Sequence, residues 1–126
     1  MAKLNIGIIL GSTRQGRLSP QVGEWVKGIA EHRADANYEI IDIADFKLPF
    51  LGEADAPGIA SWNEKLASLD GFVFIVQEYN HSITGALKNA LDLAREAGMT
   101  RQQASSAMEQ RAEPERQSIC AEFWVN

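Results

Sequence analysis

Cysteine and long apolar runs are scarce in this sequence. Cys120 is the only cysteine among 126 residues, so the chain cannot form an internal disulfide, and a reducing cytoplasm is the expected compartment. No run of apolar residues approaches the roughly 20 that a membrane-spanning helix needs. The apolar start, residues 6–10, is too short for a secretory signal and has no small-residue cleavage site after it. We therefore expect a cytoplasmic protein without a membrane partner.

Positive charge is also in the minority. Lys and Arg number 12 against 17 Asp and Glu, for a net charge of −5, which argues against nucleic acid as a partner. Apolar residues make up 45% of the chain, an ordinary value for a globular protein. The length is that of one domain with a modest core.

Apolar strands alternate with amphipathic helices in the first three quarters of the chain. Strands are expected at 4–10, 38–43 and 71–76, and helices at 19 to about 33, 59–69, and from about 84 onward. Ser19 before Pro20 predicts an N-cap, and the inner face of that helix is expected to carry Val22, Trp25, Val26 and Ile29. This alternation predicts an α/β fold with parallel strands and right-handed crossovers.

The first candidate binding loop, GSTRQGR at residues 11–17, follows the first strand. In open parallel sheets, ligands bind outside the carboxyl ends of the strands, and this loop also leads into a helix N-terminus. Its hydroxyls, guanidinium groups and backbone N–H groups favour a phosphate ligand over a solvated turn. The glycine spacing matches neither a Walker P-loop nor a dinucleotide fingerprint. A low-molecular-weight phosphatase would need a cysteine in this loop, which is absent.

The second candidate loop, QEYNHS at residues 77–82, follows the third strand. Tyr79 and His81 could stack on a flat ring, while the neighbouring amide and carboxylate groups could bind its edge. In the alternative interpretation, the loop only shapes a turn and Tyr79 covers the core. Taken alone, His81 is expected to be a surface or packing histidine. It has no second histidine or carboxylate cluster nearby, so we expect no metal site.

Two long segments, ILGSTRQGRLSPQVGEWV and QEYNHSITGALKNALD, together resemble the NADPH-dependent FMN reductase family. This family comprises flavodoxin-like flavoproteins and includes quinone, azo-dye and chromate reductases. The resemblance covers about residues 3 to 97. It implies a flavodoxin-like doubly wound parallel sheet in which strands 2-1-3 are present. Gln77 departs from the pattern, because the family usually has proline there, and the loop entry is then less rigid.

The resemblance also implies FMN and NAD(P)H as cofactors. It assigns the FMN phosphate to Ser12, Arg14 and Arg17, and places the second loop beside the isoalloxazine, mostly through backbone groups. Hydride would pass from NAD(P)H to flavin N5, so no catalytic side chain is expected. The expected cofactor-binding residues are Gly11, Ser12, Thr13, Arg14, Gln15, Arg17, Gln77, Glu78, Tyr79 and Asn80.

The implied function is that of an NAD(P)H-dependent FMN reductase that passes electrons to a small-molecule acceptor: a quinone, azo compound, metal or flavin. The alternative is a truncated flavodoxin-like binding or association domain with little or no turnover. A flavodoxin-type electron carrier is a third class. Such carriers usually have a hydroxyl-rich first loop without paired arginines, so GSTRQGR counts against it.

The core pattern stops near residue 97. Residues 98–118 contain no Ile, Leu, Val, Phe, Trp or Tyr, and the family's fourth strand and glycine-rich loop are not found. The composition is typical of disorder, and ICAEFWV at residues 119–125 is a short apolar segment. One interpretation is therefore a divergent tail that is disordered or binds a partner.

The other interpretation is a shift of the translation frame. When each triplet starts one base earlier, permitted codons translate as WNDKAAGFVSYGAAGGARAAEHLRRILGE, which contains a strand, a glycine loop and a helix in family order. Some triplets are imposed, because Met99 before Thr100 forces an Asp and Trp124 before Val125 forces a Gly. We therefore expect that one base was lost near the Ala97 codon. The chain would then hold a truncated flavodoxin-like domain at 1–97 and an out-of-frame tail at 98–126.

A domain without its fourth and fifth strands would leave the strand at 71–76 as an apolar edge. We expect either self-association into a homo-oligomer or coverage of this edge by the tail. We also expect weak FMN binding and little NAD(P)H oxidation by the 126-residue chain.

Overall fold

The computed structural model describes residues 2–53, 56–94 and 119–125, the last of these for the backbone alone. The elements follow in the order β1 (Leu4–Leu10), α1 (Ser19–Glu31), β2 (Ala36–Asp42), the 3₁₀ helix η1 (Ile43–Phe46), α2 (Pro57–Ala67), β3 (Gly71–Gln77), α3 (Gly85–Asp92) and β4 (Ile119–Val125). The sheet order is β2-β1-β3-β4, and the first three strands are parallel. The predicted α/β fold with strands 2-1-3 is confirmed.

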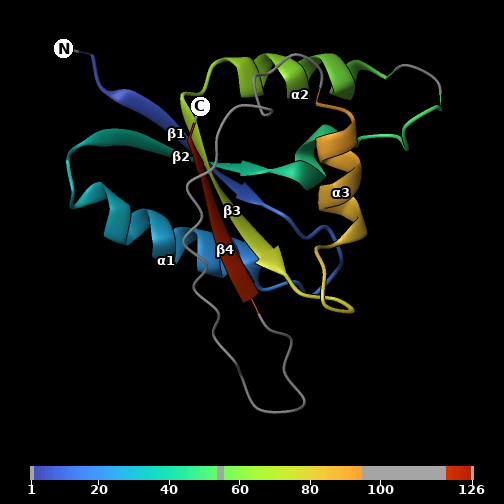
Figure 1. Cartoon of the computed structure of the whole chain (residues 1–126), viewed down its shortest axis with the longest axis horizontal. Coiled ribbons are helices and arrows are strands. Elements are labelled where there is room, and N and C mark those ends of the chain that lie inside the picture. The colour runs from blue at the N-terminus through green and yellow to red at the C-terminus, as the bar shows by residue number, and fades with distance from the viewer. Residues whose placement is uncertain (1, 54–55, 95–118, 126) are drawn as a thin grey trace.

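Helices cover both faces of the sheet, as Figure 1 shows, with α1 on one side and α2 and α3 on the other. Every residue of β3 is buried, as expected of a strand between two helical layers. The larger core cluster lies under α2, α3 and η1 and includes Trp62 and Leu66, both fully buried. The smaller cluster lies under α1 and centres on Ile8 and Ile75. The two helical layers leave the carboxyl ends of β1 and β3 free for binding loops.

Helix α1 packs on the sheet through a different face from the one predicted. Trp25 and Ile29, expected inside, are 55% and 52% exposed. The reason lies at Gly23, where an added Cβ would come within 2.6 Å of Leu10 Cδ2. The helix backbone lies close against Leu10 at this glycine, so Val22 and Val26 face the sheet and Trp25 and Ile29 turn outward.

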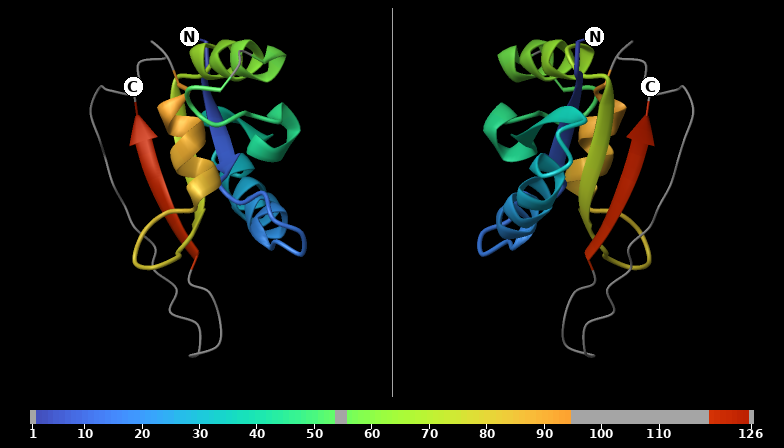
Figure 2. Two further views of the ribbon diagram at one scale, coloured as in Figure 1. Left: turned by 90° about the vertical axis from the view of Figure 1, so that its right-hand side faces the viewer. Right: turned by 90° about the vertical axis from the view of Figure 1, so that its left-hand side faces the viewer.

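The apolar edge of β3 is covered by the tail of the same chain. Strand β4 pairs with β3 in antiparallel orientation along its whole length, from Gly71 opposite Val125 to Gln77 opposite Ile119, and Figure 2 shows it at the edge of the sheet. The sequence predicted either self-association through this edge or coverage by the tail, and the structure shows coverage by the tail. The other predictions for the tail concern residues 98–126, of which the structure describes only the backbone of 119–125.

Several of the other element boundaries differ from the prediction by one or two residues, among them both ends of α2, which spans Pro57–Ala67. Strand β2 begins two residues earlier than expected, and α1 ends at Glu31 rather than near residue 33. Among the described residues, none of the helices combines the length and apolar character that a bilayer span requires.

Candidate functional site

The loops after β1 and β3 meet through a chain of side-chain hydrogen bonds. The Ser12 hydroxyl donates to Gln77 Oε1 at 3.3 Å, and the Tyr79 hydroxyl donates to the same oxygen at 3.0 Å. Arg14 Nε in turn donates to the Tyr79 hydroxyl oxygen at 3.0 Å. Ser12 and Gln77 are buried. The structure thus brings together two of the residues that the resemblance assigns to phosphate, Ser12 and Arg14, with two from the second loop, Gln77 and Tyr79.

The start of the first loop is held by β3 and α3. The Gly11 N–H donates to the Ile75 carbonyl at 2.9 Å, and an added Cβ on Gly11 would lie 2.7 Å from that carbonyl oxygen. The buried Thr84 hydroxyl donates to the Gly11 carbonyl and accepts from the Leu87 N–H at 3.1 Å. Thr84 is the N-cap of α3. One hydroxyl therefore links the first loop to the helix that follows the second loop.

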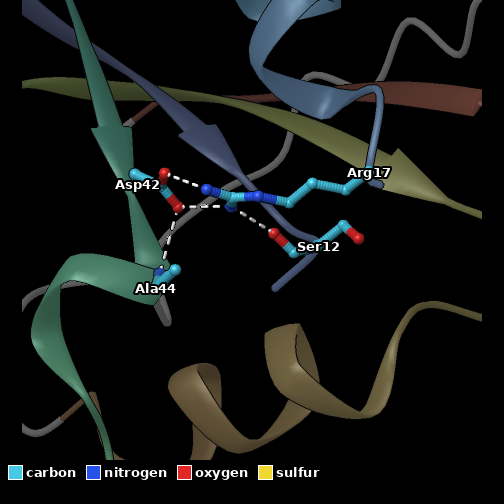
Figure 3. Close-up of polar contacts among 4 residues, drawn as sticks. All are labelled: Ser12, Arg17, Asp42 and Ala44. Atoms are coloured by element: carbon cyan, nitrogen blue, oxygen red, sulfur yellow. Dashed lines mark hydrogen bonds and ion pairs between the residues drawn. The ribbon is translucent and has the colours of Figure 1, made fainter. Parts of the chain in front are cut away.

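Arg17 binds the end of β2 and the backbone of its own loop, as Figure 3 shows. Its two terminal nitrogens donate to the two carboxylate oxygens of Asp42 at 2.6 and 2.5 Å. Its Nη1 also donates to the Ser12 carbonyl at 2.6 Å, while the Ala44 N–H donates to Asp42 Oδ1 at 3.0 Å. The guanidinium predicted to bind phosphate is thus engaged in a bidentate ion pair, a geometry that arginine forms well.

The charges of this pair are fixed by its surroundings. Burial alone would raise the pKa of Asp42, but the hydrogen bonds from Arg17 and from the Ala44 N–H, with the charge of Arg17, bring that pKa below its ordinary value. The hydrogen bond to Asp42 raises the pKa of Arg17, although burial opposes the shift. Both side chains are less than one-fifth exposed. The pair is therefore ionised at neutral pH.

The first loop also offers backbone donors within the described part of the chain. Within the described residues, no hydrogen-bond partner is found for the backbone N–H groups of Ser12, Thr13, Gln15 and Gly16. Gly16 has a φ of +69°, which favours glycine. A loop that presents several N–H groups before a helix N-terminus is suited to an anion.

Ser19 adds a further donor at the start of α1. The predicted N-cap role is wrong: Leu18 occupies that position without a side-chain cap, and Ser19 is the first helical residue. Ser19 is only 6% exposed, and its hydroxyl oxygen has no hydrogen-bond partner among the described residues. An unsatisfied buried hydroxyl costs free energy, so a ligand that accepts from it would be stabilised.

The second loop forms a tight two-residue turn. The Tyr79 N–H donates to the Ser82 carbonyl at 3.0 Å, and the Ser82 N–H donates back at 2.9 Å. Asn80 and His81 between them have φ values of +51° and +63°, a conformation that costs free energy in residues other than glycine. The His81 side chain is 99% exposed and its Nδ1 lies 3.5 Å from Glu78 Oε1. The prediction of a surface histidine is confirmed.

The remaining predicted site residues lie on the outer side of the loops. Thr13, Gln15 and Asn80 are exposed, whereas Glu78 is partly buried. The described residues contain no cluster of three or more His, Cys, Asp or Glu that could hold a metal ion. Two residues that organise the site were not predicted, Asp42 and Thr84. Thr84 could have been found, because threonine just before a helical pattern is an N-cap signal.

Comparison with known proteins identifies the family of this chain. The model of the NADPH-dependent FMN reductase family matches residues 4–111. The chain belongs to this family. The matched range includes both loops and the three parallel strands, and it extends past residue 97.

Characterised relatives have related activities. The chain is 36% identical over 95 residues to an NAD(P)H-dependent FMN reductase of Schizosaccharomyces pombe, covering 68% of this chain and 48% of that protein. It is 32% identical to a 2-hydroxy-1,4-benzoquinone reductase of a Burkholderia species, covering 72% and 50%. It is also 32% identical to a quinone reductase of Escherichia coli K12, covering 71% and 50%.

A solved structure shares the fold. This is FerB, a flavoenzyme NAD(P)H:(acceptor) oxidoreductase from Paracoccus denitrificans. The TM-score is 0.59 and the sequence identity 26%, with 79% of this chain and 52% of the FerB chain covered. The chain therefore spans about half the length of the relatives that it matches.

Proposed function

We propose that the two loops form the FMN site of an NAD(P)H-dependent oxidoreductase, with the flavin phosphate in the first loop and the ring against the second. The observation that supports this most directly is the junction of the loops through Ser12, Gln77, Tyr79 and Arg14. It places guanidinium, hydroxyl and backbone donors beside an aromatic side chain at the carboxyl ends of adjacent strands. An anionic group joined to a flat ring fits such a pair of loops.

The phosphate end of the proposed site is composed of donors. The backbone N–H groups at residues 12, 13, 15 and 16 and the hydroxyl of Ser19, which has no partner among the described residues, would hold the phosphate. Arg14 supplies positive charge from an exposed position. Each of these groups donates and none must give up a proton, so phosphate binding needs no change of protonation in the chain.

The ring end of the proposed site is the turn at residues 79–82. Its two hydrogen bonds between Tyr79 and Ser82 keep the backbone rigid although Asn80 and His81 adopt strained conformations. This rigidity would fix the backbone groups that border the ring. When bound, FMN supplies the hydride chemistry itself, and the chain binds it and orients it.

The electron acceptor we propose is a small quinone. Two of the relatives are named as quinone reductases, one of them for 2-hydroxy-1,4-benzoquinone. A flat, uncharged ring could stack on the exposed face of a flavin without a dedicated catalytic side chain. This agrees with the absence of a predicted nucleophile or general base in the two loops.

A fluorescence titration tests the proposal. FMN and riboflavin are titrated with wild-type chain and with Arg14→Ala, up to millimolar protein. We expect wild type to quench FMN more strongly than riboflavin, because riboflavin lacks the phosphate, and Arg14→Ala to reduce the difference. Menadione-dependent NADPH oxidation by the FMN-loaded chain then tests the acceptor. Equal affinity of wild type for the two flavins would exclude a phosphate site in the first loop.

A further inference from the structure

We propose that Asp42 positions the phosphate-binding backbone, acting through Arg17 rather than touching the ligand. This inference rests on the proposed function, because it assigns a task to the ion pair beside the first loop. The side chains concerned lie on the β2 side of β1, since Asp42 is the last residue of β2 and Arg17 reaches it from the loop. Ser12 Oγ and Arg14 face the β3 side, where their partners Gln77 and Tyr79 lie.

The planarity of the peptide bond makes the argument specific. Arg17 holds the Ser12 carbonyl oxygen at 2.6 Å. In a trans peptide the C=O and N–H point in opposite directions, so the Thr13 N–H points away from Arg17. The Thr84 hydroxyl fixes the preceding Gly11 carbonyl in the same way, and this orients the Ser12 N–H. Two successive N–H groups, which have no partner among the described residues, are thus oriented by hydrogen bonds to the carbonyls of their own peptide groups.

Asp42 is needed to fix the orientation of the Arg17 guanidinium, which binds both Asp42 carboxylate oxygens and the Ser12 carbonyl oxygen. The Asp42 carboxylate accepts from both terminal nitrogens of Arg17 and from the Ala44 N–H. These bonds fix the plane of the guanidinium, and with it the position of the nitrogen that holds the Ser12 carbonyl. A phosphate bound directly by Arg17 would lie close to this carboxylate and be repelled by it. The Arg17–Asp42 ion pair, which we call the clamp, therefore holds the loop backbone in place and is a poor direct ligand for phosphate.

The test compares Asp42→Asn with Glu39→Gln. Both substitutions remove one negative charge from β2 and break an ion pair, but Glu39 pairs with Lys65 on the exposed surface. ¹⁵N-labelled wild type and variants are titrated with inorganic phosphate, and the amide signals of Ser12 and Thr13 are followed by NMR. FMN affinity is measured in parallel by fluorescence, and thermal unfolding verifies that each variant is folded.

The clamp predicts that Asp42→Asn raises the dissociation constant for phosphate and FMN about tenfold, the usual effect of losing one well-placed hydrogen bond. Glu39→Gln should match wild type. Arg17→Lys should behave like Asp42→Asn, because a single ammonium cannot hold both carboxylate oxygens and the carbonyl. Tighter phosphate binding by Asp42→Asn, with affinity kept in Arg17→Lys, would show Arg17 to be a direct ligand and overturn the proposal.

The remaining outcomes separate the clamp from the flavin site. If phosphate shifts the Ser12 and Thr13 amides of wild type but FMN does not bind, the flavin proposal fails and the clamp stands. If FMN binds wild type and Asp42→Asn equally, the clamp fails and the flavin proposal stands. Wild-type amides that do not respond to phosphate would also overturn the clamp.

Discussion

Replacing Thr84 with valine should destabilise the fold far more than its small change in shape suggests. Valine keeps the volume of threonine and removes only the hydroxyl. That hydroxyl caps α3 by accepting from the Leu87 N–H and donates to the Gly11 carbonyl. Thr84 is buried, so water cannot replace either bond. The substitution therefore removes two interactions without creating a cavity.

The magnitude follows from the two lost bonds. Loss of an N-cap costs about 1 kcal/mol, and a buried carbonyl left without its donor costs about 1–3 kcal/mol. Together we expect about 2–4 kcal/mol for Thr84→Val. Thr84→Ser is the matched control, because it keeps the hydroxyl and loses one methyl group, at a cost of about 0.8 kcal/mol.

Urea unfolding, followed by tryptophan fluorescence and circular dichroism, measures both variants. The expected order of unfolding free energy is wild type, then Thr84→Ser, then Thr84→Val, with at least about 1 kcal/mol between the two variants. If Thr84→Val were as stable as Thr84→Ser, the hydroxyl would contribute nothing. The proposed link between the first loop and α3 would then be wrong.

Four further results are expected. Arg14→Ala should weaken FMN binding by about 1.5–3 kcal/mol if its guanidinium holds the phosphate, and unchanged fluorescence titrations would remove that assignment. The pKa of Asp42 is lowered in the folded chain. Its ion pair therefore stabilises the fold at pH values above the unfolded pKa of about 3.9. This stabilisation is lost as the pH falls through the pKa of Asp42 in the folded chain. Urea midpoints of wild type should therefore fall more steeply below about pH 4 than those of Asp42→Asn, and parallel curves would argue against the pair. Trp62→Phe should lower the free energy of unfolding by about 1–3 kcal/mol, because it removes the donor to the Ala90 carbonyl. Calorimetry should then show a lower Tm, and an unchanged Tm would contradict this prediction. Sequencing the gene from the Ala97 codon onward should find codons compatible with the shifted frame, and incompatible codons would favour a divergent tail.

The strands were predictable because burial on both faces leaves a continuous apolar run. Strand β1 matches its prediction at both ends, and β3 extends one residue further than expected. The inner face of α1 was not predictable from periodicity alone, because hydrophobicity favoured Trp25 and Ile29. The close approach at Gly23 decided it instead, and that contact depends on where the helix crosses the sheet.

The two loops of the candidate site could be found in the sequence, since each follows an apolar strand and contains concentrated polar groups. The role of Arg17 could not. Its partner Asp42 is 25 residues away, and the two meet only because β2 lies next to β1. An arginine in a loop looks the same whether it binds a ligand or a carboxylate of the next strand. The Ser19 hydroxyl, which has no partner in the described part of the chain, could not be predicted for a similar reason, because its burial depends on packing.

The pairing of β4 with β3 has a consequence for the order of folding. Strand β4 pairs with β3 alone among the described strands, whereas β3 also pairs with β1, which lies even further away in the sequence. Both pairings close long loops, and distant contacts form slowly. Because β3 is the strand on which β4 docks, β4 can join the sheet only after β3 has formed. Until then the edge of β3 is open, so refolding yield should fall as protein concentration rises.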